Sequence, residues 1–246
     1  MYQSLEASLH DLFWASESHA DESHLLENFL QQQTGPSLEI GCGSGRLMLP
    51  LLEKGYQVEG VEIASDMVEL LHKNAKERDV SPLVHHCAIE EFQPTQTYSS
   101  FAIPAFTLQL LSRASARQVL RKLRDISSEQ TKLYLTLFIP WAEILDELEI
   151  DTWYLDKETQ LDSGQTARCF TKHQIDRLHQ TLYREHRYEL AQQTHLSSQT
   201  LQWYFLPELI NLLESSGWTY QEYDADFQKG NHDTDASVIT VYATAS

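Results

Sequence analysis

Positively charged residues are scarce in this sequence of 246 residues. It has 18 lysines and arginines against 36 aspartates and glutamates, which gives a formal net charge of −18. Binding to nucleic acid depends on Lys and Arg side chains that neutralise phosphates, so this balance argues against a nucleic acid partner. The excess of acid has two interpretations: a highly soluble surface, or the attraction of a cationic or amine substrate.

Cysteine is sparse as well. Cys42, Cys87 and Cys169 are odd in number and far apart, without the paired spacing of a zinc site or a disulfide framework. We therefore predict no metal centre and a reducing, cytoplasmic location. Long apolar runs are also missing, since no window approaches the ~20 apolar residues of a membrane span. The first residues lack the basic and apolar regions of a signal peptide, and we expect no membrane association.

Strand-like and helix-like segments alternate along much of the chain, which predicts an α/β fold with a parallel sheet and helices on both faces. The expected strands are 37–40, 57–62, 83–87, 98–103, 132–138, 218–223 and 238–242. Helical periodicity separates most of them, and a last helix begins at Leu206 and ends at Gly217.

This alternation stops between residues 140 and 200, where aromatic side chains are interleaved with charges, as in half-exposed antiparallel strands. We predict three parts in one elaborated domain. Residues 1–36 form an N-terminal helical lid, residues 37–139 and 201–246 form the core, and residues 140–200 form an antiparallel β insertion that covers a substrate.

A glycine-rich turn joins the first predicted strand to a helix through Gly41, Gly43 and Gly45. Such a turn lets a ligand approach backbone N–H groups and the positive end of the helix. The dinucleotide fingerprint requires a glycine where this chain has Arg46, so the spacing argues against NAD and FAD. A nicotinamide oxidoreductase is therefore the least favoured of the alternatives.

Residues 38–46 (LEIGCGSGR) and 58–67 (VEGVEIASDM) together resemble the class I S-adenosylmethionine-dependent methyltransferase family, of the type that acts on small molecules. The resemblance implies a Rossmann-like, mostly parallel seven-stranded sheet and S-adenosylmethionine as cofactor, with S-adenosylhomocysteine as product. It also implies that the glycine turn holds the amino-acid part of the cofactor and that Glu62 holds both ribose hydroxyls. An ionised carboxylate suits that role because it offers two acceptor oxygens.

Two further segments extend the resemblance. Residues 87–92 lie where relatives flank the adenine, although Ala88 replaces an expected Asp and leaves recognition to backbone groups, Ile89 or Glu90. Residues 103–111 resemble the segment that faces cofactor and substrate, with Leu110 where some relatives carry a histidine. The predicted cofactor-binding residues are Glu39, Gly41, Cys42, Gly43, Gly45, Arg46, Glu62, Ile63, Met67, Ala88, Ile89 and Phe106. For Cys42 we favour a packing role beside the cofactor over a reactive thiol.

Four residues are candidates to face the substrate: Trp14, Gln109, Arg168 and Trp203. The competing interpretation is that Trp14 is a core residue and that the charged strands of the insertion are a solvated face. We assign no catalytic residue, because in-line methyl transfer depends mainly on positioning and on the exclusion of water.

The predicted function is transfer of a methyl group from S-adenosylmethionine to a nitrogen, or an oxygen, of a small-molecule acceptor. The alternative is a catalytically silent S-adenosylmethionine-binding protein that acts as a sensor or partner subunit. The sequence leaves the oligomeric state open, a homodimer included.

Overall fold

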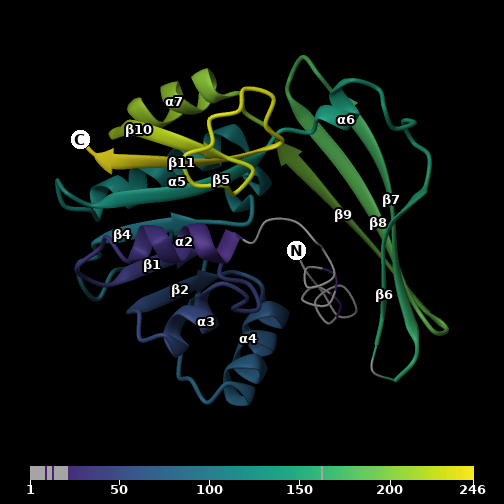
Figure 1. The fold of residues 1–246 in the computed structure, drawn as a ribbon, viewed down its shortest axis with the longest axis horizontal. Helices are drawn as coiled ribbons and strands as arrows, with labels where there is room; N and C mark the ends of the chain where they lie inside the picture. The colour runs from purple at the N-terminus through teal and green to yellow at the C-terminus, as the bar shows by residue number, and fades with distance from the viewer. Residues whose placement is uncertain (1–8, 10–12, 14–21, 162) are drawn as a thin grey trace. The chain divides into compact units, whose positions relative to one another are not determined.

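The computed structural model describes residues 9, 13, 22–161 and 163–246, and these divide into two compact units (Figure 1). The larger unit holds residues 22–139 and 204–246. The smaller unit holds residues 140–161 and 163–203 together with Leu9 and Phe13.

The larger unit is built on a seven-stranded sheet with the order β10-β11-β5-β4-β1-β2-β3. Its strands are β1 (Ser37–Ile40), β2 (Val58–Glu62), β3 (Leu83–His86), β4 (Ser100–Ile103), β5 (Lys132–Phe138), β10 (Trp218–Ala225) and β11 (Val238–Ala245). Strand β11 runs antiparallel to β5 and β10, and the other pairs are parallel. This Rossmann-like sheet confirms the predicted α/β fold class.

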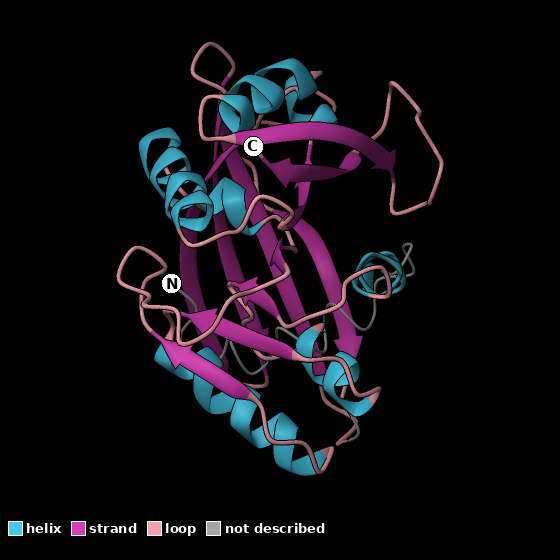
Figure 2. Cartoon of the chain, turned by 90° about the vertical axis from the view of Figure 1, so that its left-hand side faces the viewer, coloured by secondary structure: helices cyan, strands magenta, loops and turns pink. Residues whose placement is uncertain are grey.

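Helices cover both faces of this sheet (Figure 2). They are α2 (Glu22–Leu30), α3 (Met48–Glu53), α4 (Ser65–Glu77), α5 (Arg113–Asp125) and α7 (Leu206–Glu214), with a short 3-10 helix η1 (Thr107–Leu110) after β4. Because side chains alternate along a strand, Leu133, Leu135 and Leu137 of β5 pack in one core cluster with α5 and α7. Tyr134 points the other way and packs in a second cluster with α2 and α3.

Helix α2 is part of the core of the larger unit. Leu25, Leu26, Phe29 and Leu30 are buried in the second cluster, and the Phe29 ring lies 5.4 Å from that of Tyr134. The predicted boundary at residue 36 therefore falls after a helix that already belongs to this core. The proposed lid would then consist of the residues before Glu22. Most of these lie outside the described part of the chain.

The smaller unit contains a four-stranded antiparallel sheet with the order β6-β7-β8-β9. Its elements are α6 (Trp141–Ile144), β6 (Tyr154–Gln160), β7 (Thr166–Asp176), β8 (Thr181–Leu190) and β9 (Gln193–Gln202). Ala167, Cys169 and Tyr188 on one face form a small apolar cluster with Leu9 and Phe13. Antiparallel strands were predicted here, and they extend two residues beyond the expected end at Thr200.

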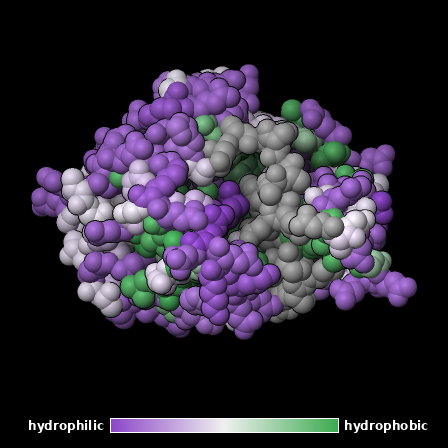
Figure 3. All heavy atoms as spheres, turned by 60° about the horizontal axis from the view of Figure 1, so that its bottom comes forward, coloured by the Kyte–Doolittle hydropathy of each residue, from purple (hydrophilic) through white to green (hydrophobic). Residues whose placement is uncertain are grey.

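Hydrophilic residues dominate the face of the molecule drawn in Figure 3, as the strongly acidic composition leads one to expect. None of the described helices is long and apolar enough to cross a membrane.

Candidate cofactor-binding site

The turn after β1 depends on glycine at three positions for two different reasons. Gly41, Gly43 and Gly45 have φ values of +73°, +54° and +82°, a region that other residues rarely adopt. A Cβ at Gly41 would lie 2.6 Å from Thr107 Cγ2, and one at Gly45 would lie 2.7 Å from Leu49 Cγ. No atom of the described residues lies within 4 Å of a Cβ at Gly43, so its backbone is open on that side.

This turn lies where the strand order of the sheet reverses. Strands β1 and β4 are hydrogen-bonded neighbours, although β2 and β3 separate them in the sequence. The turns that follow them therefore meet at the carboxyl ends of the strands, as the close approach of Thr107 to Gly41 shows. Open α/β sheets bind ligands at such a switch point.

Glu62 ends β2 and ties the glycine turn to it. One carboxylate oxygen, Oε2, accepts a hydrogen bond of 2.9 Å from the N–H of Gly43. The other, Oε1, accepts from Ile63 at 2.9 Å and from Ala64 at 2.7 Å. Because three backbone donors fix the carboxylate, its remaining acceptor position, on Oε2, has a defined direction.

Glu39 lies on the opposite face of β1 from the core residues Leu38 and Ile40, because side chains alternate along the strand. It is buried, and no group in the described part of the chain bonds to its Oε2 atom. Burial raises the pKa of Glu39 to about 8, an effect that Arg46 opposes and that Glu22 and Glu62 reinforce. Such a carboxyl group is suited to a cationic ligand group, which would restore its charge.

Glu22 is a buried acid that the sequence reasoning did not identify. Its carboxylate accepts hydrogen bonds from the N–H of Ala105 at 3.1 Å, from Thr136 Oγ1 at 2.9 Å and from Tyr134 Oη at 3.3 Å. Arg46 Nη2 lies 3.7 Å away, while burial raises the Glu22 pKa above its ordinary value. In the sequence Glu22 resembles any acid at the start of an amphipathic helix.

Ala105 and Phe106, after β4, both have left-handed backbone conformations, with φ values of +50° and +62°. Such strain in residues other than glycine is concentrated at functional sites. The N–H of Phe106 donates to Thr136 Oγ1 at 3.4 Å. The Phe106 ring contacts Phe138 edge-on at 5.1 Å and stacks with Phe227 at 6.4 Å.

Gln109 is fully buried, and its amide bonds to Phe138 in both directions. Its Nε2 donates to the carbonyl of Phe138 at 3.0 Å, and its Oε1 accepts from the N–H of Phe138 at 2.8 Å. This pair of bonds, which joins η1 to β5, accounts for the Gln109 side chain without a substrate.

The other predicted cofactor residues differ in exposure. Ile63 is 54% exposed and Ala88 is partly exposed, whereas Ile89 and Met67 are buried and pack in the interior. Cys42 is also buried, and its Sγ would lie 2.5 Å from a Cβ at Gly60. Burial raises the Cys42 pKa well above its ordinary value, so its environment favours packing over nucleophilic chemistry.

The predicted substrate-facing residues belong to different units, Gln109 to the larger one and Arg168 and Trp203 to the smaller one. Arg168 is exposed and forms an ion pair of 2.6 Å with Glu158, and Trp203 is buried. Trp14 lies outside the described residues, so its role stays a prediction.

Comparison with known proteins agrees with this geometry. Residues 38–129, which contain the glycine turn and Glu62, match the family model described as "Methyltransferase domain". Over these residues the chain is similar to methyltransferase domains. The match supports the methyltransferase resemblance that the sequence motifs carry. No curated protein sequence matches the chain.

Three solved structures share the fold of this protein over almost the whole chain. An S-adenosylmethionine-dependent methyltransferase from Clostridium acetobutylicum has a TM-score of 0.80 at 10% identity, covering 97% of this chain and 96% of its own. The methyltransferase CcbJ from Streptomyces caelestis has 0.78 at 21% identity, with the same coverages. CalS10, an amino pentose methyltransferase from Micromonospora echinaspora, has 0.70 at 16% identity, covering 100% and 99%.

Proposed function

We propose that this methyltransferase transfers a methyl group to an amine nitrogen of a small-molecule acceptor. The observation that carries the proposal is the site at the ends of β1 and β2, where the Glu62 carboxylate is fixed beside the open backbone of Gly43. Glu39 and Glu22 lie buried close by, so acids outnumber the one nearby guanidinium, that of Arg46. A site with this charge balance suits a cofactor that carries a sulfonium and an ammonium group.

Different residues of the larger unit would bind different parts of the cofactor. The open backbone of the glycine turn would accommodate the amino-acid part of S-adenosylmethionine, and Glu62 would accept from the ribose hydroxyls. Ile63 would offer an apolar surface beside them, since it is 54% exposed at the end of β2. The cofactor supplies an activated methyl group, and the protein contributes positioning and exclusion of water.

Nitrogen is favoured over oxygen as the acceptor for two reasons. One of the structural neighbours is an amino pentose methyltransferase. In addition, the net charge of −18 attracts an amine in its protonated form, and the amine attacks after losing its proton. The smaller unit is our candidate for acceptor recognition, because its sheet adds to a fold that already provides the cofactor site.

The experiment is a methyl-transfer assay with paired acceptors that differ only in an amino or a hydroxyl group, such as amino sugars and their parent sugars. Formation of S-adenosylhomocysteine with the amines alone supports the proposal. Transfer to the hydroxyl partner instead would assign an O-methyltransferase. Tight cofactor binding without transfer to any acceptor in a broad panel would favour the silent binding protein.

A further inference from the structure

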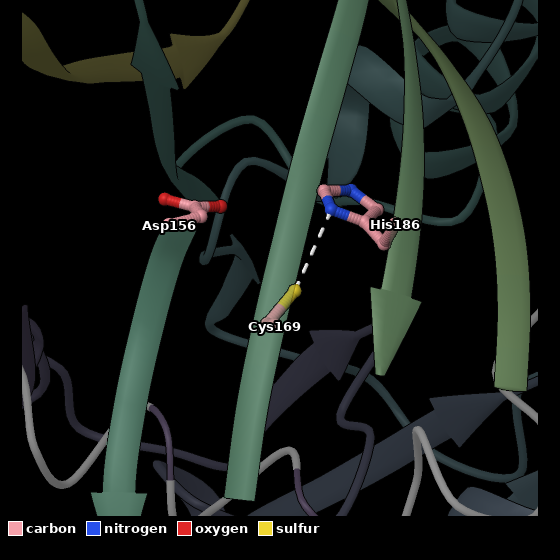
Figure 4. Close-up of side chains that lie close together, drawn as sticks. All are labelled: Asp156, Cys169 and His186. Atoms are coloured by element: carbon pink, nitrogen blue, oxygen red, sulfur yellow. Dashed lines mark hydrogen bonds between the residues drawn. The ribbon is translucent and has the colours of Figure 1, made fainter. Parts of the chain in front are cut away.

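Three side chains with different donor atoms converge on one face of the smaller sheet. Asp156 from β6, Cys169 from β7 and His186 from β8 place a carboxylate oxygen, a sulfur and a ring nitrogen within 4.8 Å of one another (Figure 4). The Cys169 Sγ lies 3.9 Å from His186 Nδ1. Cys169 and His186 are buried and Asp156 is exposed, so the cluster is reached from the side of the carboxylate.

The strand register explains why these residues meet although they are distant in sequence. Thr171 on β7 lies opposite His186 on β8, which directs both side chains to the same face of the sheet. Between Leu155 and Lys157 the pairing of β6 with β7 is irregular, and Asp156 lies at that irregularity. Such bulges redirect a side chain, and here the Asp156 carboxylate reaches 2.7 Å from the Thr171 hydroxyl.

Two neighbouring side chains hold this cluster in a defined orientation. The Thr171 hydroxyl donates to Asp156 Oδ2, and the Gln199 amide lies 3.0 Å from His186 Nε2. Because Gln199 holds Nε2, the other ring nitrogen, Nδ1, faces the sulfur. Metal-ligating histidines and carboxylates are supported by outer-shell hydrogen bonds of this kind.

We propose that Asp156, Cys169 and His186 bind one divalent cation of the zinc type. Sulfur and imidazole donors select zinc or cobalt over magnesium and calcium, which prefer oxygen ligands. Tetrahedral zinc with bonds of about 2.3 Å to sulfur and about 2.0 Å to nitrogen places those two atoms about 3.5 Å apart. The observed 3.9 Å needs only a small movement to close. The fourth position would be left to water or to a Lewis-basic group of a ligand.

Binding requires one rearrangement and the release of one proton. The Thr171 hydroxyl has one proton and donates it to Asp156, so it can only accept from His186 Nδ1, which lies 2.8 Å away. The Nδ1 atom is therefore the protonated ring nitrogen in this arrangement. When a cation binds Nδ1, the ring proton moves to Nε2. The Gln199 side-chain amide then rotates so that its oxygen accepts a hydrogen bond from Nε2–H. The Cys169 thiol gives its proton to solvent, as metal binding to cysteine requires.

The test uses Co²⁺ as a spectroscopic probe and Zn²⁺ in calorimetry, on reduced protein without added histidines. We expect one equivalent of Co²⁺ to produce the near-ultraviolet charge-transfer band of a cobalt thiolate. Cys169→Ser should abolish the band, and Asp156→Asn and His186→Gln should each weaken Zn²⁺ binding. Gln199→Ala should weaken it about ten- to hundredfold, the usual effect of an outer-shell partner.

Matched controls are available in the same chain. Cys87→Ser removes a partly exposed thiol, and His179→Gln removes an exposed histidine that pairs with Asp176 at 2.7 Å. Both should leave the band and the Zn²⁺ affinity unchanged. Asp156 is exposed, so Asp156→Asn keeps the test valid if Cys169→Ser fails to fold.

A wild-type protein without the thiolate band would overturn the proposal, as would a band that persists in Cys169→Ser or disappears in Cys87→Ser. The three residues belong to the smaller unit, and the glycine turn that we assign to the cofactor belongs to the larger one. Stabilisation by S-adenosylhomocysteine is therefore measured in the Asp156, Cys169 and His186 variants and should not change. Its loss in the wild type would count against the proposed function alone.

Discussion

The Glu62 carboxylate accepts a hydrogen bond of 2.9 Å from the backbone N–H of Gly43, so the end of β2 is fastened to the one glycine of the turn that faces open space. Most of the proposed cofactor chemistry depends on this link. The roles of the two residues can be tested by separate mutations, because Glu62 supplies a carboxylate and Gly43 supplies backbone freedom.

We expect Glu62→Ala to reduce S-adenosylhomocysteine affinity at least tenfold. The substitution removes an acceptor proposed for two ribose hydroxyls, and hydrogen bonds to a charged group contribute roughly 1.5 to 3 kcal/mol each. Isothermal calorimetry measures the change, with Glu69→Ala on the exposed side of α4 as the control. Unchanged affinity in the Glu62 variant would show that Glu62 only stabilises the turn and does not bind the cofactor.

Alanine at Gly41 and at Gly43 should have different effects. Both positions have positive φ, which costs a residue with a Cβ about 1 to 2 kcal/mol. Gly41→Ala adds a clash at 2.6 Å with Thr107 and should lower the melting temperature more. Gly43→Ala meets no atom of the described residues, so it should affect cofactor affinity more than stability. Equal losses of stability in the two variants would contradict this division.

The stability of the protein should carry a pH dependence from Glu39. Its pKa rises from the ordinary 4.5 to about 8 on folding, so the folded state retains a proton that the unfolded state loses. This stabilisation is complete below pH 4.5 and is lost as the pH rises to about 8, at roughly 1.4 kcal/mol for each pH unit.

Glu39→Gln tests this expectation, because the amide is neutral at every pH. The difference in unfolding free energy between Glu39→Gln and the wild type should increase in favour of the variant from pH 5 to pH 8 and then level off. Urea unfolding at several pH values measures it, with Glu69→Gln as the control. A difference that does not vary with pH would show that Glu39 is ionised in the folded protein.

We predict that replacing residues 141–203 with a short flexible linker abolishes methyl transfer and leaves cofactor affinity within a few-fold. The glycine turn, Glu62 and the seven-stranded sheet all lie in the larger unit and would be retained. Calorimetry and a transfer assay measure the two properties separately. Full turnover on the native acceptor would refute a role of the insertion in acceptor recognition.

Local pattern was sufficient to predict the sheet and the position of the glycine turn from the sequence. Strands β1 and β5 lie where the apolar runs place them, because a buried strand must be continuously apolar or alternate with period two. The glycine turn and Glu62 were identifiable because they are adjacent to strand ends, and a parallel sheet gathers such ends at one edge. These features depend on neighbours in the sequence and on one rule of topology.

Only the tertiary structure decided which distant side chains share a buried environment. Glu22 meets Tyr134 and Thr136 of β5 across more than a hundred residues, and Gln109 of η1 bonds to Phe138 of β5. Asp156, Cys169 and His186 converge through strand register and an irregularity in pairing, neither of which composition or spacing reveals. Burial and register are properties of the packed chain, and they determine whether a carboxyl group is ionised and whether a cysteine has a histidine beside it.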